Sequence, residues 1–385
     1  MKKNRRKICF ITGTRADYGI LTPVMKAVEL SDKLELQLVV TGMHLLPQFG
    51  RTIDEIKKDG FPVTAEVAIG MEDDGISMAH FVGEAINRFA DVFKKYKPDI
   101  LVVLGDRGEM LAGAIAANYL GISVAHIHGG EVSGHIDEVI RHAITKLSHI
   151  HFAATKKAKE RIIKLGEKKE NVHISGAPSL DCILNEVLPE KSKLFKKYNF
   201  NQDKSLFILI QHPVASELDV LENNVKKIVE AVASFNSQTL VIYPNSDAGG
   251  QKIIKILESY RDTSFFNLMK NVPHKDYLGF LKSSDVLIGN SSSGIIEAPS
   301  FGLPVVNIGS RQNNRERASN VVDVDYDEKQ IIKAIKKALE YGTIAKKEKN
   351  PNHNPYGDGK ASQRIVAVLE KTPLGNDLLS KQITY

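Results

Sequence analysis

Short apolar runs, rich in β-branched residues, recur along this chain and are separated by longer segments with helical spacing of apolar positions. The runs predicted to be strands are residues 7–14, 34–42, 99–107, 123–130, 149–155, 171–176, 205–213, 239–247, 285–293 and 304–311. Strands that are apolar throughout are typical of a parallel sheet covered by helices on both faces. The pattern therefore predicts an α/β fold of doubly wound, Rossmann-like sheets.

The strands fall into two groups, because a charged, proline-containing segment interrupts them near residues 182–204. We expect an N-terminal domain over residues 1–182 and a C-terminal domain over residues 183–360. The amphipathic pattern in residues 361–385 predicts a helix and a tail that pack back on the N-terminal domain. Ligands of such sheets bind beyond the carboxyl ends of the strands. Two sheets facing each other across a cleft would therefore bring the polar strand-end residues together.

The composition is that of a soluble globular protein, with 42% hydrophobic and 25% charged residues among 385. Two cysteines without a CxxC motif exclude a disulfide scaffold and favour a reducing cytoplasm. The chain has no apolar stretch near the ~18 residues of a membrane-spanning helix. The basic residues 1–7 are expected to be a solvated lead-in rather than a signal peptide, because the apolar run behind them is short.

The formal net charge is +6. The lysine-rich segments 156–170 and 331–340 follow helical patterns without interleaved aromatic residues, which favours a solvated helix face over a nucleic-acid interface. A basic balance also suits a small anionic substrate.

The turn GTRADYG (13–19) follows the first strand and matches neither GxGxxG nor a P-loop. Arg15 in this turn is a candidate phosphate ligand. The alternative is a surface ion pair between Arg15 and Asp17.

The segment GDRGE (105–109) ends a very apolar strand, where charged residues are more often functional than structural. Asp106 is a candidate general acid or base. Arg107 is a candidate substrate ligand, and the alternative is that it only neutralises Asp106.

The densest group of titratable residues lies in HIHGGEVSGHIDEVIRHAI (126–144). His128, Glu131 and Asp137 are its candidate catalytic residues, and Arg141 can orient the carboxylates. A metal site is one interpretation, because His and carboxylates are metal ligands. Against it, HExxH is absent and no second cluster has a known spacing. We therefore expect a metal-free acid–base site.

In the second half, His212 follows an apolar strand and is a candidate donor of a proton or hydrogen bond to a leaving phosphate. The alternative is a capping histidine. Asn245 in YPNSDAGG follows the next strand, where it can bind a ligand or simply form the turn.

The segment NSSSG (290–294) joins a strand to a helical pattern. Ser291, Ser292 and Gly294 would lie where a helix N-terminus favours an anion, although such residues are often simple caps. Glu297, one turn later, would repel a phosphate but can hold the two hydroxyls of a ribose. Anion and diol together indicate a nucleoside diphosphate, and Arg311 is a further candidate for its charge.

These motifs together resemble the hydrolysing UDP-N-acetylglucosamine 2-epimerases, which supply N-acetylmannosamine for sialic acid synthesis. GTRADYG, GDRGE, GGEVSG, IDEVIRHAITKLSH, HPV, YPNSDAG and GNSSSGIIEAPSFGLPVVNIGSRQ match in order over nearly the full chain. A closely similar branch acts on UDP-N,N′-diacetylbacillosamine for legionaminic acid synthesis and remains the alternative.

The resemblance implies a two-domain GT-B fold with UDP in the interdomain cleft. It also implies loss of H2 and UDP to give a 2-acetamidoglucal, then hydration with inverted geometry at C2. By motif position it assigns Asp106, His128 and Asp137 to acid–base chemistry and assigns Arg15, His212, Asn245, Ser291, Ser292, Glu297 and Arg311 to UDP binding.

One residue departs from the family pattern. Many members read HIEGG, with a catalytic glutamate, where this chain has His128 in HIHGG. Glu131 is a candidate substitute for that glutamate. We expect a carboxylate base, with Asp137 and Asp106 ahead of Glu131, and a supporting acid–base or orienting role for His128.

The resemblance implies no metal and no redox cofactor, and it implies a homo-oligomer, either a dimer or a tetramer. The expected partners are the UDP-sugar and UDP, without nucleic acid or membrane. Two other classes of function remain. A GT-B glycosyltransferase would share the nucleotide site but leave C2 untouched, and a nucleotide-sugar sensor would bind without turnover.

Overall fold

The computed structural model describes residues 5–47, 50–70, 75–133, 136–244, 248–348 and 354–384. The chain divides into two compact units. One comprises Met1–Glu131, Ile136–Asn185 and Tyr356–Tyr385, and the other comprises Val132–His135 and Glu186–Pro355. Each unit is built on its own parallel sheet, so the predicted α/β fold of two doubly wound, Rossmann-like sheets is confirmed.

The sheet of the first unit has the strand order β3-β2-β1-β4-β5-β6-β7. Its strands are β1 Arg6–Thr12, β2 Leu34–Thr41, β3 Val63–Val67, β4 Ile100–Leu104, β5 Ser123–Ile127, β6 Ile150–Ala153 and β7 Val172–Ile174. All neighbours pair in parallel. The order reverses between β1 and β4, which makes the carboxyl ends of these two strands the topological switch point.

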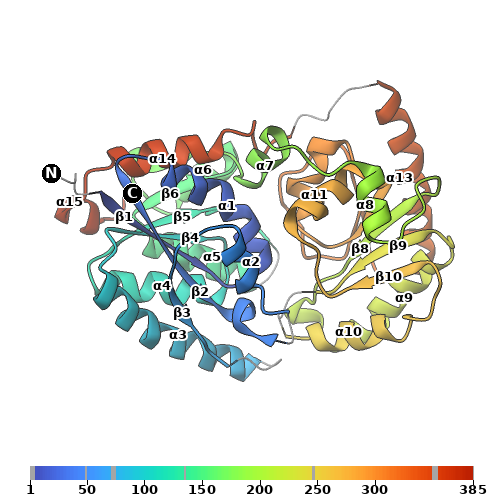
Figure 1. The fold of residues 1–385 in the computed structure, drawn as a ribbon, viewed down its shortest axis with the longest axis horizontal. Coiled ribbons are helices and arrows are strands. Elements are labelled where there is room, and N and C mark those ends of the chain that lie inside the picture. The colour runs from blue at the N-terminus through green and yellow to red at the C-terminus, as the bar shows by residue number, and fades with distance from the viewer. Residues whose placement is uncertain are drawn as a thin grey trace. The chain divides into compact units, whose positions relative to one another are not determined.

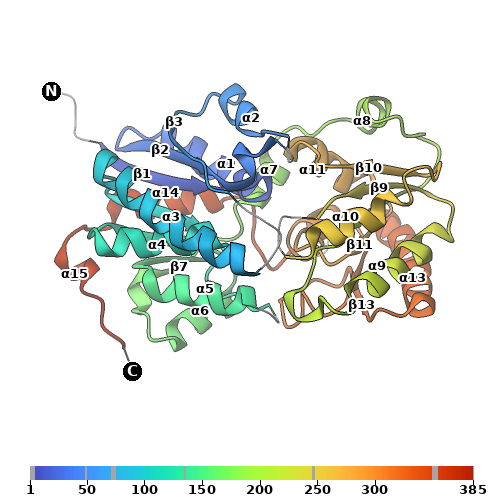
Figure 2. The same cartoon turned by 90° about the horizontal axis from the view of Figure 1, so that it is seen from below.

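Helices cover both faces of this sheet because alternate strand residues point to opposite sides. They are α1 Arg15–Glu29, α2 Ile53–Lys58, α3 Gly75–Tyr96, α4 Gly108–Tyr119, α5 Ile136–Leu147, α6 Lys156–Lys164, α7 Ser179–Asn185, α14 Ala361–Lys371 and α15 Asn376–Leu379. Ile8 and Phe10 of β1 pack with α1, α2 and α14, whereas Cys9 and Ile11 pack with α3, α4 and α5 (Figures 1 and 2). The described part of the unit also has two 3-10 turns, η1 Gly42–Leu45 and η3 Lys169–Asn171.

The second sheet repeats the same topology with the order β10-β9-β8-β11-β12-β13. Its strands are β8 Leu206–Ile210, β9 Gln238–Ile242, β10 Phe266–Met269, β11 Val286–Gly289, β12 Val305–Ile308 and β13 Val321–Val324. The helical segments of this unit are α8 Lys191–Lys197, η4 Ala215–Glu217, α9 Leu221–Ala233, α10 Gly250–Glu258, α11 His274–Ser283, α12 Ser293–Ile296, η5 Ala298–Phe301 and α13 Glu328–Glu348. Here the switch point lies between β8 and β11.

The core of the second unit packs α9, α10 and α13 against one face of its sheet (Figure 1). Elsewhere in the unit, an aromatic cluster joins α8 to α11: Phe195, Tyr198 and Phe200 all lie within 6.4 Å, ring centroid to centroid, of Phe280. Among the described residues, no helix is both long enough and apolar enough to cross a membrane.

The last helices of the chain belong to the first unit, although about 170 residues of the second unit precede them. Helix α14 lies against α1 (red beside blue in Figure 1), and Ile365 and Leu369 are fully buried in the shared core. The carboxylate of Asp181 in α7 accepts hydrogen bonds from the backbone N–H groups of Ala361 (2.8 Å) and Ser362 (2.7 Å), so it caps α14 from a distant part of the sequence.

The C-terminal tail is anchored by a buried carboxylate, Glu167. Lys381 donates to Glu167 Oε2 (2.7 Å) and to the Ser148 carbonyl (2.6 Å). Lys146 donates to Glu167 Oε1 (2.6 Å), and His151 Nε2 lies 3.1 Å from Oε2. Burial alone would raise the pKa of Glu167, but the hydrogen bonds from His151, Lys146 and Lys381 lower it to about 2.

We expect Glu167→Gln to destabilise the first unit in a pH-dependent way. The folded-state pKa is depressed from 4.5 to about 2, so ionised Glu167 contributes stability above pH 4.5 that is lost as the pH falls through this window. Wild type should exceed the variant by about 1–3 kcal/mol in free energy of unfolding near pH 6, and the difference should shrink toward pH 3. Urea unfolding at pH 6, 4.5 and 3.5 measures this. A difference that stays constant or grows on acidification would contradict the assignment.

The ten predicted strands are all present, but β3, β10 and β13 were not predicted. All three are edge strands and only partly buried. They therefore lack the continuous apolar run that identifies an interior parallel strand.

Candidate functional site

The polar residues singled out by the sequence in the first unit follow β1, β4 and β5. These are neighbouring strands at and beside the switch point, so their carboxyl ends lie at one edge of the sheet. The edge is built from three segments: the turn between β1 and α1, the turn between β4 and α4, and the segment from His128 to Glu131 after β5.

The turn after β1 is held by a buried aspartate. Thr14 caps α1, and Asp17 completes a capping box by accepting from the Thr14 backbone N–H at 2.8 Å. Asp17 also accepts a hydrogen bond from the Thr12 hydroxyl. Burial, and then the nearby Glu109 carboxylate, raise the pKa of Asp17 to about 6. Arg15, the first residue of α1, forms an ion pair with Glu55 of α2. The alternative of an Arg15–Asp17 ion pair is therefore wrong, because the Asp17 carboxylate accepts its hydrogen bonds within the turn.

The turn after β4 places a second buried carboxylate against the first turn. Arg107 Nε donates to Glu109 Oε1 at 2.7 Å. A Cβ at Gly13 would collide with the Glu109 carboxylate, so the turn after β1 needs glycine for this close approach. Arg107 is therefore engaged with Glu109, and the alternative in which it neutralises Asp106 is not what the structure shows.

Asp106 is instead paired with Arg141 of α5. The Arg141 side chain is 4% exposed and the Asp106 side chain 22%. Arg141 also donates to the Glu131 carbonyl oxygen (3.3 Å), so one guanidinium ties the β4 turn to the segment after β5. A guanidinium beside a carboxylate forms a charge-assisted hydrogen bond, so this ion pair holds the Asp106 side chain in place.

His128 lies just beyond the end of β5 and has left-handed backbone geometry, with φ of 62°. This conformation is uncommon for a residue with a side chain and tends to be retained at functional sites. Nδ1 of His128 lies 2.5 Å from Glu131 Oε1, and both residues are buried. A carboxylate accepts, so Nδ1 carries the proton of this bond, and Nε2 is the ring nitrogen that Glu131 does not engage.

Asp137 lies in the first turn of α5, one turn before Arg141, and is partly buried. In the described part of the chain, no three His, Cys, Asp or Glu side chains form a group that could hold a metal ion. The first unit thus presents an imidazole–carboxylate pair and a carboxylate–guanidinium pair at one sheet edge.

In the second unit, Asn290 joins the two strands at the switch point. Its Oδ1 accepts from the His212 backbone N–H (2.7 Å), and its Nδ2 donates to the His212 carbonyl (2.9 Å). Asn290 is fully buried, and its own carbonyl accepts from Gln312 Nε2 (2.9 Å) and Arg311 Nη1 (3.2 Å). His212, partly buried after β8, and Arg311, after β12, are therefore both hydrogen-bonded to Asn290, the first through its side chain and the second through its carbonyl.

The segment after β11 corrects one expectation. Helix α12 is only one turn long, Ser293–Ile296, and Ser292 caps it without a side-chain hydrogen bond. A single turn sums too few peptide dipoles to give the helix-terminus field that we expected at Ser291 and Ser292. Ser291 and Ser292 instead offer their hydroxyls in a tight loop, whereas Gly294 lies inside α12 and its N–H donates to the Ser291 carbonyl (3.1 Å).

A tyrosine supports this loop from the neighbouring helix. Tyr277 of α11 is hydrogen-bonded to the Ser293 hydroxyl, and Ser291 Oγ lies 3.0 Å from Ser293 Oγ. Burial raises the pKa of Tyr277, and the nearby Glu297 carboxylate raises it further. Glu297, buried at the junction of α12 and η5, thus lies beside the same loop. Asn245 lies outside the described residues.

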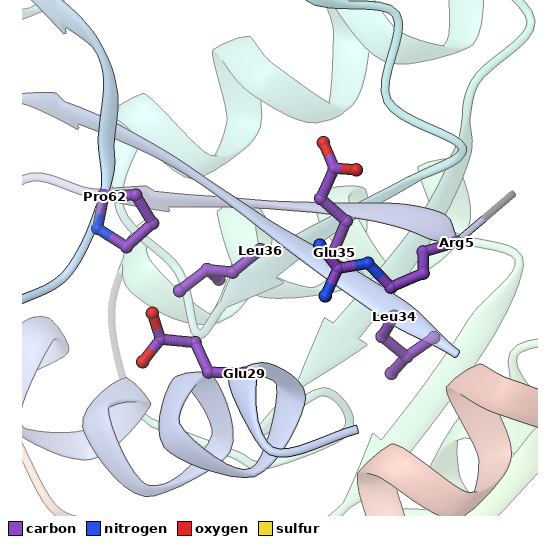
Figure 3. Close-up of a pocket in the computed structure, with 6 residues that line it drawn as sticks. All are labelled: Arg5, Glu29, Leu34, Glu35, Leu36 and Pro62. Carbon is purple, nitrogen blue, oxygen red and sulfur yellow. The ribbon is translucent and has the colours of Figure 1, made fainter. Parts of the chain in front are cut away.

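One surface pocket lies away from these strand ends. It has a volume of about 300 Å³ and is lined by Arg5, Glu29, Leu34, Glu35, Leu36 and Pro62 (Figure 3). Leu34 begins β2 and Arg5 precedes β1, so the pocket lies at the amino ends of the strands, opposite the residues described above. It takes no part in the candidate site.

Three residues of these networks were not singled out as site residues: Glu109, Tyr277 and Asn290. Glu109 and Asn290 are buried and Tyr277 is partly buried, and each acts by holding a candidate residue or its turn. Asn290 carried a signal in the sequence, because a strictly polar residue directly after a buried strand needs hydrogen-bond partners. Tyr277 carried none, since it lies on an ordinary amphipathic helix.

The UDP-N-acetylglucosamine 2-epimerase family model matches residues 26–370 of this chain. A UDP-N,N′-diacetylbacillosamine 2-epimerase (hydrolysing) of Legionella pneumophila is 43% identical, covering 99% of this chain and all of the relative. A UDP-N-acetylglucosamine 2-epimerase of Neisseria meningitidis serogroup B is 33% identical, over 96% and 97% of the two chains. A crystal structure of the Neisseria meningitidis UDP-GlcNAc 2-epimerase bound to UDP-GlcNAc shares the fold, with a TM-score of 0.80 at 23% identity, over 95% of this chain and 100% of that one.

Proposed function

This chain belongs to the UDP-N-acetylglucosamine 2-epimerase family, and we propose that it is a hydrolysing 2-epimerase of a UDP-linked 2-acetamido sugar. The observation that carries the proposal is the 43% identity to a hydrolysing 2-epimerase over essentially the whole of both chains. The pairs His128–Glu131 and Asp106–Arg141 at one sheet edge support it, because the reaction needs a positioned base and a fixed charge.

The preferred substrate in this proposal is UDP-N,N′-diacetylbacillosamine. The sequence motifs alone led us to expect UDP-N-acetylglucosamine, with the 4-acetamido sugar as the alternative. The relative that acts on the 4-acetamido sugar is 43% identical, against 33% for the relative named for UDP-N-acetylglucosamine. UDP-N-acetylglucosamine therefore becomes the second candidate.

The reaction divides into an elimination and a hydration. A base removes H2, the C2–H electron pair forms the C1=C2 bond, and the C1–O bond to the diphosphate breaks to release UDP. Water then adds across the double bond of the 2-acetamidoglycal, with the hydroxyl at C1 and a proton at C2 on the opposite face. The products are UDP and the free sugar with inverted configuration at C2.

The geometry of the first unit favours His128 as the base. Its Nδ1 is held by Glu131, so the ring is oriented, and histidine is the side chain that most often serves as a general acid or base. Asp106, which we had expected to be a leading base together with Asp137, is engaged by Arg141, so its carboxylate is directed at the guanidinium. We assign Asp106 to electrostatic support and Asp137 to protonation of C2 in the second half-reaction.

Residues of the second unit are assigned to the nucleotide. The hydroxyls of Ser291 and Ser292 would hold the diphosphate, with Arg311 balancing its charge. Gly294 lets α12 pack closely on Val305 of β12 beside them. Glu297 would accept from the ribose hydroxyls. His212 would donate a hydrogen bond or a proton to the departing phosphate, and Asn290 holds its backbone in place.

The test is turnover of the two UDP-sugars in heavy water, followed by nuclear magnetic resonance. We expect UDP release with one deuterium at C2 of the epimerised sugar, and a higher kcat/KM for the 4-acetamido substrate. Release of an unepimerised sugar without deuterium at C2, or transfer to an acceptor, would replace the epimerase by a hydrolase or a glycosyltransferase. Binding without turnover of either compound would indicate a sensor. Faster turnover of UDP-N-acetylglucosamine would reverse the substrate preference alone.

A further inference from the structure

We propose that His126 is a positioning residue that holds the Asp106–Arg141 ion pair and the His128 turn in one fixed arrangement. The inference rests on the proposed function for its consequence in catalysis. His126 belongs to β5, is fully buried, and contacts the turn after β4, helix α5 and the segment that begins at His128. A histidine with only a structural role in a core needs hydrogen-bond partners for its two ring nitrogens. The contacts of His126 also hold neighbouring backbone segments in place.

The first contact fixes the turn that carries Asp106. His126 Nε2 lies 2.7 Å from the carbonyl oxygen of Gly105. A carbonyl only accepts, so Nε2 carries the proton. Gly105 has φ of 69°, a left-handed conformation that directs the chain out of β4 immediately before Asp106. The bond therefore holds the peptide from which the Asp106 side chain projects.

The second contact fixes the helix that carries the partner of Asp106. Thr145 Oγ1 lies 3.2 Å from His126 Nδ1 and 3.0 Å from the Arg141 carbonyl oxygen, so its one hydroxyl proton serves one of these acceptors while the other remains a packing contact. Thr145 is one helical turn after Arg141 on α5. One imidazole thus contacts both the turn of the carboxylate and the helix of the guanidinium, which sets their separation.

The third contact fixes the turn that begins at His128. A Cβ at Gly129 would lie 2.9 Å from His126 Nδ1 and 3.1 Å from Thr145 Oγ1. The backbone at Gly129 therefore packs directly on the imidazole edge, and only glycine fits there without displacing it. Because Gly129 follows His128, the position of the ring limits where the His128–Glu131 pair can lie.

The imidazole is suited to this task because it is neutral and rigid. Burial lowers the pKa of His126 to about 3, so the Nε2–H donor is retained at every working pH. A leucine of similar size would fill the space but would leave the Gly105 carbonyl without its hydrogen-bond donor. A buried carbonyl without a donor lowers the free energy of unfolding, or the turn moves until the carbonyl finds another partner. A glutamine can place an N–H near the position of Nε2 and should restore the bond.

The test compares His126→Leu with His126→Gln. We expect His126→Leu to lower kcat about tenfold while the KM for the UDP-sugar and the Kd for UDP change by less than about twofold, because geometry at the reacting groups is lost and nucleotide contacts are not. His126→Gln should recover most of the kcat. His149→Leu is the matched control: His149 is also buried in this sheet and accepts from the Val124 N–H at 3.0 Å, but it precedes β6 at the amino end. It should lower the Tm and leave kcat unchanged.

Amide hydrogen exchange without any sugar nucleotide separates this inference from the proposed function. In His126→Leu, exchange should increase at residues 105–107 and 128–131, and in His126→Gln it should resemble the wild type. An inactive wild type with this exchange pattern would overturn the proposed function and leave the positioning arrangement standing. An active wild type with equal kcat and exchange in all three proteins, or with kcat lost equally in the Leu and Gln variants, would overturn the positioning role.

Discussion

Replacement of His128 by alanine should lower kcat by about 10²–10⁴-fold and abolish deuterium incorporation at C2 in heavy water, because a positioned general base contributes this much to proton transfer. The Nδ1 contact with Glu131 orients the ring, and the left-handed backbone at His128 holds it at the end of β5. The elimination and the exchange of H2 share the same base, so both should fail together. Single-turnover release of UDP and C2 exchange, measured separately, check the prediction.

Three further variants identify the role of each carboxylate. Glu131→Gln should retain part of the activity, since an amide can still hold the ring but accepts less strongly. Asp106→Asn should lower both steps without abolishing exchange, and Asp137→Asn should allow exchange while slowing formation of the epimer. His80→Ala, an exposed position on α3, is the matched control and should behave as wild type. Full exchange in His128→Ala with loss of exchange in Asp106→Asn or Asp137→Asn would return the role of base to a carboxylate.

Replacement of Glu297 by glutamine should raise the KM for the UDP-sugar and the Kd for UDP by roughly 10–150-fold, which corresponds to about 1.5–3 kcal/mol for a charged hydrogen-bond partner of buried hydroxyls. The kcat at saturation should change by no more than about twofold, because ribose contacts are made equally in the ground state and the transition state. Glu297 is buried beside the Ser291–Ser293 loop and Tyr277, so water cannot readily replace its carboxylate. Titration with UDP and steady-state kinetics measure the two effects.

Glu340→Gln provides the control for this variant, because Glu340 is an exposed residue of α13 and its loss of charge is otherwise the same. An unchanged KM with a severely reduced kcat in Glu297→Gln would contradict the ribose assignment. That result would place the Glu297 carboxylate at the reacting carbon atoms instead.

The strands and their carboxyl-end residues were predictable from the sequence for a local reason. An interior parallel strand is buried on both faces, so its run of apolar residues is continuous and its end is marked where polar residues begin. This identified β1, β4, β5, β8, β11 and β12 together with the turns that follow them. The same reasoning failed for β3, β10 and β13, which are only partly buried at the sheet edges.

The chain by itself therefore determined the fold class, the family, and the edge of each sheet at which its unusual residues gather. Only the tertiary structure decided which of those residues are partners. Asp106 forms an ion pair with Arg141, 35 residues away, rather than with the adjacent Arg107. The Asn290 side chain is hydrogen-bonded to the backbone of His212, 78 residues away. The structure also separates two histidines that lie close together in the sequence. His126 is buried beneath the turn after β5, whereas His128 begins that turn. Partner choice depends on distances between segments that the fold brings together, and no local pattern of apolar and polar positions encodes those distances.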